Sequence, residues 1–272
     1  MNRLFVTLPL ACICLAACGQ RAAEVDTQDY QAVRARFGEL YQQERYAEAA
    51  ELLEPALAQF PDQVMANAYN LAIVYDRTAE HAKGMDALRF AHERGIWFHV
   101  RAFDQPLWNE YRKQSGFEAI VARNTALWQE AQRIAGPKML VTVPQGSETG
   151  RTYPLFIALH GGGGNMTEFR DVWKSDVLSN EFVTAYLQSS QVVAMDGYSW
   201  TENMETARCE ITEQYDEIRG RYPVNEDQVV VGGFSSGGMA ALEVMLANDI
   251  PVVGFVALCP AHIDGFTAPA VA

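Results

Sequence analysis

A serine between small residues offers nucleophilic chemistry in the second half of the chain. The run GFSSG at residues 233–237 follows the apolar run 229–231 and precedes a helical pattern. A strand that turns directly into a helix at a serine strains the serine backbone, so the residues two before and two after it must be small. Gly233 and Gly237 meet this requirement. We therefore predict that Ser235 is a nucleophile held clear of a sheet.

A second glycine-rich run could stabilise the negative charge that such a nucleophile creates. The run HGGGG at residues 160–164 follows the apolar stretch 155–159. Glycines let the backbone pass close to a substrate and present an N–H to its carbonyl oxygen, so Gly161 and Gly162 are candidate oxyanion donors. The N–H of Ser236, after the nucleophile, is the other candidate. Each such donor typically stabilises the transition state by about 3 kcal/mol.

The glycine-rich run at residues 160–164 does not match the two nucleotide-binding motifs that are also rich in glycine. A phosphate-binding loop needs Gly-Lys-Ser/Thr, and residues 160–170 contain no lysine. A dinucleotide fingerprint needs its third glycine at the position of Met166.

The two motifs together resemble those of the α/β-hydrolases, and Gln188–Gln191 and Asp196–Trp200 are similar to segments of carboxylesterase/phospholipase-like members. The resemblance implies hydrolysis of a small-molecule carboxylic ester through an acyl-enzyme on Ser235. It implies oxyanion binding by Ser236 and by Gly161 or Gly162. No metal or organic cofactor is expected. Two interpretations of Trp200 stay open, a wall of the substrate pocket and a buried core residue.

The base that would activate Ser235 is the point where the sequence departs from the family. Family members carry the acid and the histidine after the serine, and here His262 alone follows, with Asp264 two residues on. His262 oriented by Asp264 is one explanation. A fragment of a longer enzyme and an inactive truncated product are the others, and we favour these, expecting the last strands to be missing and an apolar sheet edge uncovered. The resemblance gives His160 a local structural role.

Strands and helices alternate around these motifs. Strands are predicted at Met139–Val143, Pro154–Leu159, Phe182–Gln188, Gln228–Phe234 and Val252–Leu258. The clearest helix carries apolar residues on one face, at Met204, Ala207, Ile211, Tyr215, Ile218 and Tyr222. Such alternation predicts an α/β fold, with a parallel sheet covered on both faces, over residues 137–272. Gly136-Pro137 marks the boundary with what precedes it.

Residues 30–135 are predicted to form an all-α domain with an internal repeat. Leu40, Ala49, Leu53 and Ala56 recur as Tyr75, Gly84, Leu88 and Ala91, a pattern that resembles tetratricopeptide repeats. One interpretation is a groove for a protein partner; the other is a support for the α/β part. We favour support, because two repeats offer little groove. The histidines of this half are expected at the surface or in packing: His81, His92 and His99.

The first residues are predicted to be a targeting segment. A basic start and an apolar run, too short to span a bilayer comfortably, make residues 1–17 a signal peptide. Its end, Leu15–Cys18, resembles the lipobox of bacterial lipoproteins, which implies lipid on Cys18, a tether over residues 18–29 and export to the cell envelope. With Gly19 next, the anchor would be the outer membrane of a Gram-negative cell. Cys209 and Cys259 are left either to pair or to remain separate buried thiols.

The net charge of the chain limits the classes of molecule that it could bind. The formal net charge is −13 and the sequence pI about 4.8, which argues against nucleic acid, since that partner needs a clustered basic face. Two further functions stay open beside the esterase. One is a lipid-anchored binding protein with a non-catalytic hydrolase remnant, and the other is a peptidase on the same fold.

Overall fold

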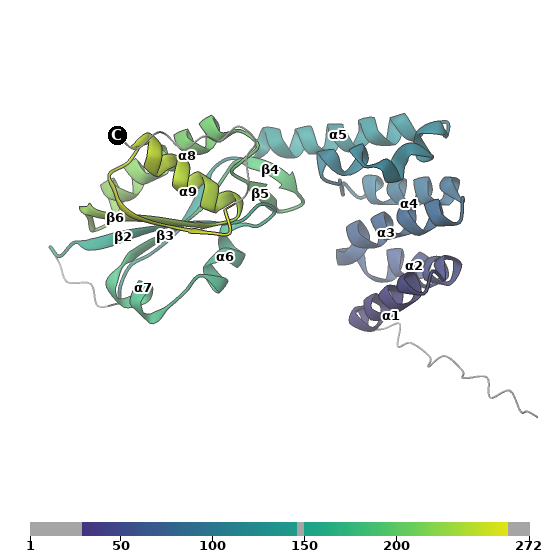
Figure 1. Cartoon of the computed structure of the whole chain (residues 1–272), viewed down its shortest axis with the longest axis horizontal. Coiled ribbons are helices and arrows are strands. Elements are labelled where there is room, and N and C mark those ends of the chain that lie inside the picture. Colours follow the sequence, from purple (N-terminus) through teal and green to yellow (C-terminus); the bar gives the residue numbers. More distant parts are fainter. Residues whose placement is uncertain (1–28, 146–149, 261–272) are drawn as a thin grey trace, which may run out of the picture.

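The computed structural model describes residues 29–145 and 150–260 and consists of a helical part followed by an α/β part (Figure 1). The last helix of the first part, α5 (Phe117–Ile134), runs from the stack of helices toward the α/β part. Predicted residues Cys18, His262 and Asp264 lie outside the described residues, as do the predicted signal peptide and nearly all of the tether.

The helical part buries one apolar face of each helix in a common core. Leu53, Leu71 and Leu88, from three successive helices, are almost wholly buried there. Helix α2 packs on α3, and α3 on α4. The helices before α5 are α1 (Tyr30–Gln42), α2 (Tyr46–Gln59), α3 (Val64–Arg77) and α4 (His81–Glu93), with the 3₁₀ turns η1 (Pro61–Gln63), η2 (Val100–Asp104), η3 (Pro106–Asn109) and η4 (Tyr111–Lys113).

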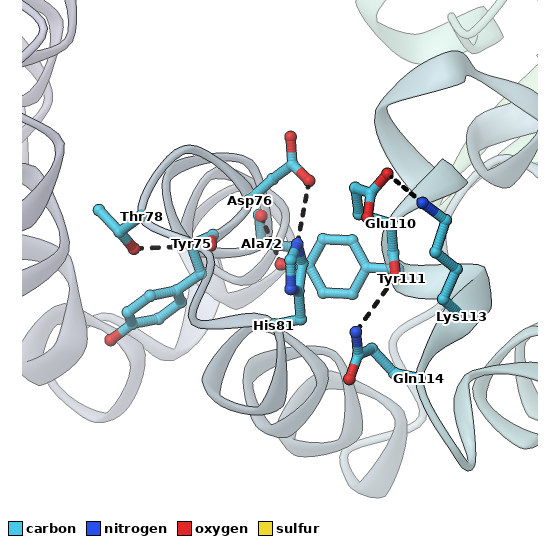
Figure 2. A network of polar contacts seen from close by, with 9 residues as sticks. All are labelled: Ala72, Tyr75, Asp76, Thr78, His81, Glu110, Tyr111, Lys113 and Gln114. Carbon is cyan, nitrogen blue, oxygen red and sulfur yellow. Dashed lines mark hydrogen bonds and ion pairs between the residues drawn. The ribbon is translucent and has the colours of Figure 1, made fainter.

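A tyrosine fastens the 3₁₀ turns to this stack (Figure 2). A Cβ atom on Gly84 would lie 1.9 Å from the Tyr111 hydroxyl oxygen, so only glycine admits the ring here. The hydroxyl donates a hydrogen bond to the carbonyl oxygen of Ala72 at 2.6 Å, and His81 meets the ring edge-on at a centroid distance of 4.9 Å. The turns between α4 and α5 are thereby packed against α3 and α4.

All five predicted strands of the main sheet are present. They are β1 (Lys138–Thr142), β2 (Tyr153–Leu159), β3 (Val183–Gln188), β6 (Val224–Phe234) and β7 (Val252–Leu258), in the order β1-β3-β2-β6-β7. The last four run parallel, whereas β1 pairs antiparallel with β3. The predicted parallel arrangement is therefore wrong for β1. A parallel connection needs a long crossover, and only a short link joins β1 to β2.

Helices cover both faces of the sheet (Figure 1). On one face α8 (Met204–Arg221) and α9 (Ser236–Ala247) bury Ile211, Ala240 and other residues in the larger core of this part. On the other face α6 (Met166–Val172) and α7 (Asp176–Glu181) pack near Phe156 and Tyr186. The predicted apolar face of α8 is confirmed, since Ala207, Ile211, Tyr215 and Ile218 are all buried.

A small two-stranded sheet, not predicted from the sequence, follows β3. It consists of β4 (Gln191–Ala194) and β5 (Gly197–Ser199), paired antiparallel. This β4–β5 hairpin lies between α5 and the glycine-rich run that follows β2.

Strand β7 lies at one side of the sheet and exposes apolar side chains. Within the described residues it pairs with β6 alone, and the exposed fractions of Val253 and Phe255 are 66% and 45%. Cys209 and Cys259 are separate and exposed, so neither the disulfide nor the pair of buried thiols is found. No helix in the part of the chain that the structure describes is long and apolar enough to cross a membrane.

Candidate active site

Ser235 occupies the turn between β6 and α9 with a backbone conformation that side-chain-bearing residues rarely adopt. Its φ is 52° and its ψ −115°. A Cβ on Gly233 would lie 2.2 Å from the carbonyl carbon of Gly237, and a Cβ on Gly237 would lie 2.2 Å from the carbonyl oxygen of Leu159. The geometry therefore requires both glycines that the sequence singled out. The Ser235 N–H donates to the carbonyl oxygen of Leu258 at 2.9 Å, which ties the strained turn to β7.

The amino terminus of α9 begins directly after the serine, at Ser236. Among the described residues, the N–H groups of Ser236 and Gly237 have no hydrogen-bond acceptor, as expected for the first turn of a helix. A helix amino terminus carries about half a positive charge. Negative charge that develops on a group bonded to Ser235 would therefore meet unpaired donors and a favourable dipole.

The glycine-rich run after β2 passes beside this turn. Strand β2 pairs with β6 so that Leu159 faces Gly233, which places the run next to the serine. A Cβ on Gly161 would lie 2.9 Å from the ring of Phe234, and one on Gly162 would lie 3.5 Å from the Ser236 hydroxyl oxygen. The structure thus brings together the four residues that the sequence predicted for nucleophile and oxyanion binding: Ser235, Ser236, Gly161 and Gly162.

The backbone hydrogen bonds of the glycine-rich run engage Gly163 and Gly164. The Gly163 N–H donates to the carbonyl oxygen of Tyr198 at 2.8 Å, and the Gly164 N–H donates to that of Gly161 at 3.1 Å. The N–H groups of Gly161 and Gly162 find no acceptor among the described residues. These two are the N–H groups that the sequence analysis assigned to the oxyanion.

His160 is a buried, uncharged ring beneath the run. It is 1% exposed, and burial lowers the pKa of its imidazole from the ordinary value to about 4. Its Nδ1 lies 2.8 Å from the carbonyl oxygen of Gly161, so the neutral ring donates a hydrogen bond there when the proton is on Nδ1. Its ring lies 5.2 Å, between centroids, from that of Trp200. This environment suits the local structural role that was expected.

An aromatic pocket of about 370 Å³ opens beside the glycine-rich run. The Phe169 and Trp173 rings stack with centroids 4.9 Å apart, and both line the pocket. Trp200 is fully buried and lies outside the lining, so its interpretation as a core residue holds. Phe169 and Trp173 were not predicted from the sequence, although their i, i+4 spacing shortly after the glycine-rich run was a usable signal. The lining residues are His160, Gly161, Gly162, Gly164, Asn165, Glu168, Phe169, Val172, Trp173 and Phe234.

The predicted base and acid, His262 and Asp264, lie outside the described residues. The histidines of the helical part, His81, His92 and His99, belong to α4 and the segment after it. His92 is buried and hydrogen-bonded to Asn124. No cluster of metal-ligating side chains occurs in residues 29–145 and 150–260.

The comparison with protein families agrees with this fold. Residues 156–272 match the model of the Alpha/beta hydrolase family. The match leaves out the helical part and covers less than half of the chain. Together with the mostly parallel sheet, it shows that the second part of the chain has the α/β-hydrolase fold. A search of curated proteins found no match.

Several solved structures are similar over part or most of the chain. An uncharacterized protein from Bacillus cereus ATCC 10987 is 21% identical, with 83% of this chain and 71% of that one covered and a TM-score of 0.36. The Bacillus cereus carboxylesterase is 18% identical, with 52% and 68% covered and a TM-score of 0.39. A phospholipase/carboxylesterase from Dyadobacter fermentans DSM 18053 is 20% identical, with 47% and 62% covered and a TM-score of 0.36. Similarity this low carries no activity or substrate from those proteins to this chain.

Proposed function

We propose that this chain is a serine hydrolase that cleaves a small carboxylic ester through an acyl-enzyme on Ser235. The observation that carries the proposal is the strained backbone of Ser235 at the start of α9, beside the unpaired N–H groups of Gly161 and Gly162. Strain of this kind costs about 1 to 3 kcal/mol and persists where the surrounding structure enforces it, often at active sites.

In the proposed first step, the Ser235 hydroxyl oxygen bonds to the ester carbonyl carbon, and a base takes the hydroxyl proton. The carbonyl oxygen becomes an oxyanion, which accepts hydrogen bonds from the N–H of Ser236 and from Gly161 or Gly162. The carbon–oxygen bond to the alcohol then breaks, and the alcohol leaves with the proton. Water repeats the sequence on the acyl-enzyme and releases the acid.

Among the histidines of this chain, His262 is the candidate for the base and Asp264 for its orienting carboxylate, on sequence order alone; in a longer form of the enzyme these roles would fall to residues that follow. A serine hydroxyl needs an adjacent base to react at neutral pH. His160 does not suit that role, because its ring is buried and its Nδ1 is engaged by Gly161.

The pocket beside the glycine-rich run would hold an apolar group of the ester. Its aromatic wall of Phe169 and Trp173 favours uncharged carbon-rich groups. Glu168 at the same pocket would disfavour an anionic substituent.

The test is intact-mass labelling of the purified protein by a fluorophosphonate, which reacts with an activated serine. We expect one adduct on the wild type and on Ser179→Ala, which removes a serine hydroxyl from α7, away from the site. Ser235→Ala should give none.

Absence of an adduct on a wild-type chain shown to be folded by circular dichroism would contradict the proposal. The chain would then be better explained as a binding protein with a non-catalytic hydrolase domain, the second function that the sequence left open.

A further inference from the structure

Helix α5 holds the β4–β5 hairpin through two side chains. The Gln132 side-chain amide donates to the carbonyl oxygen of Ser190 at 3.0 Å and accepts from the N–H of Val192 at 3.0 Å. One turn earlier, the Trp128 indole Nε1–H donates to the carbonyl oxygen of Val192 at 2.9 Å. Figure 1 shows the end of α5 beside β4, with the helical stack at its other end.

These contacts use the backbone groups along one edge of β4. The other edge of β4 pairs with β5, where Val192 faces Tyr198. The Gln132 amide therefore takes the place of a neighbouring strand, donating and accepting as a peptide group would. Each hydrogen bond goes to main chain, so together they hold the position of β4 irrespective of its side chains.

The same hairpin holds the glycine-rich run on its other side. Tyr198 accepts a hydrogen bond from the Gly163 N–H at 2.8 Å and donates its own N–H to the carbonyl oxygen of Gly164 at 2.9 Å. A Cβ on Gly197 would lie 2.6 Å from the carbonyl oxygen of Gly163, so the two backbones are in direct contact. Val192, which is hydrogen-bonded to α5, therefore lies opposite Tyr198, which is hydrogen-bonded to the glycine-rich run.

We infer that Gln132 and Trp128 are positioning residues for the oxyanion site. Their hydrogen bonds hold β4 in place, and β4 holds Tyr198 through the hairpin. Tyr198 in turn holds the N–H of Gly163 and the carbonyl oxygen of Gly164, which follow Gly161 and Gly162 in the chain. The inference rests on the proposed function, because the run is an oxyanion site only if Ser235 is the nucleophile. It gives the helical part a role in the reaction without any contact with the substrate.

Other contacts keep the hairpin folded when those of α5 are lost. Glu210 on α8 accepts hydrogen bonds from the Ser190 N–H at 3.1 Å and from the Ser189 hydroxyl at 3.2 Å. The Gln191 side chain donates to Asn203 at 3.0 Å and accepts from it at 2.6 Å. Loss of the α5 contacts should therefore loosen the run rather than unfold the part that carries it.

Two variants test the inference in the full chain. Gln132→Ala removes two hydrogen bonds, and Trp128→Phe removes one donor while keeping an aromatic ring. The control is Gln129→Ala, which changes an exposed glutamine on the same helix. We expect each test variant to lower the limiting rate of fluorophosphonate labelling by about 10-fold or more, since misplacement by 1 Å can cost about 100-fold. The inhibitor concentration at half-maximal rate should change little.

Hydrogen exchange of residues 160–165 supplies a readout that does not depend on activity. Faster exchange there in both test variants, with Gln129→Ala like the wild type, supports the inference. Faster exchange confined to residues 190–194, or unchanged labelling rates in both test variants, would overturn it. If the folded wild type is not labelled at all, the proposed function fails, and exchange at residues 160–165 alone decides whether α5 holds the run.

Discussion

Gly237 and Leu159 approach so closely that a single added carbon would collide: a Cβ on Gly237 would lie 2.2 Å from the Leu159 carbonyl oxygen. This contact sets the depth of the turn that carries Ser235, because it joins the start of α9 to the end of β2. We predict that Gly237→Ala costs about 3 kcal/mol of unfolding free energy and abolishes labelling at Ser235. Urea denaturation and fluorophosphonate mass labelling measure the two effects.

Gly238 is the matched control for this prediction. A Cβ there would meet its nearest atom, the Gly233 carbonyl oxygen, at 3.2 Å, a tight contact that small shifts relieve. Gly238→Ala should therefore cost less than half as much and keep the adduct. Equal losses in the two variants would show that the Gly237–Leu159 contact does not set the turn.

The backbone strain at Ser235 predicts a trade between stability and reactivity. Glycine adopts a φ of 52° at little cost, so Ser235→Gly should raise the unfolding free energy by about 1 kcal/mol while abolishing labelling. Ser235→Ala keeps the Cβ and should leave stability near that of the wild type. If Ser235→Gly is no more stable than Ser235→Ala, the serine is not strained in solution.

The site was largely predictable from sequence because its chemistry is local. Gly233 and Gly237 are close to Ser235 in the chain, and the glycines of the other run directly follow His160. The steric limits on a tight turn can therefore be recognised within each run, whatever tertiary structure surrounds it. Core strands were predictable for a similar reason, since a strand buried on both faces is apolar along its length. The antiparallel direction of β1 was not predictable in this way, because a strand has the same apolar pattern whichever way it runs beside its neighbour.

Tertiary contacts account for what the sequence analysis missed. Gln132 and Trp128 lie on a helix whose first apolar residues pack in the helical core, and nothing local marks the two as partners of β4. Trp200 could be assigned to the core only once its side chain was found fully buried and outside the pocket lining. Gly84 was identified from the sequence as a position of the repeat, and the structure shows that it makes room for Tyr111 from a later turn.

The Ser236 hydroxyl is predicted to be dispensable. Ser236 is 3% exposed and its hydroxyl oxygen has no hydrogen-bond partner in the described part of the chain. Ser236→Ala keeps the backbone N–H assigned to the oxyanion, so labelling should persist, and stability should rise by up to about 1 kcal/mol, because an unpaired buried hydroxyl is unfavourable. A large loss of labelling in this variant would assign the hydroxyl a part in the chemistry.

Anchoring to the cell envelope is a prediction from Leu15–Cys18 alone. Cells that express the chain and are fed an alkyne-tagged fatty acid should incorporate the tag into the wild type and not into Cys18→Ser. The tagged protein should sediment with membranes, because each buried CH₂ of a lipid chain contributes about 0.8 kcal/mol to membrane binding. Incorporation that survives Cys18→Ser would place the lipid on another residue or remove the assignment.

Acid should destabilise the protein through His160. Burial holds the pKa of its folded-state imidazole at about 4, whereas an unfolded histidine titrates near 6.5. Between these values the unfolded chain binds a proton that the folded chain does not, so the unfolding free energy falls as pH drops from about 6.5 to 4. The loss between pH 7 and pH 5 should be about 2 kcal/mol. His92, whose pKa burial also lowers, acts in the same direction.

The variant His160→Asn tests this prediction. Its side chain can still donate a hydrogen bond to Gly161, so it should keep only the part of this pH dependence that His92 supplies. Urea denaturation at the two pH values decides: equal losses in wild type and variant would mean that His160 is accessible to protons in the folded state.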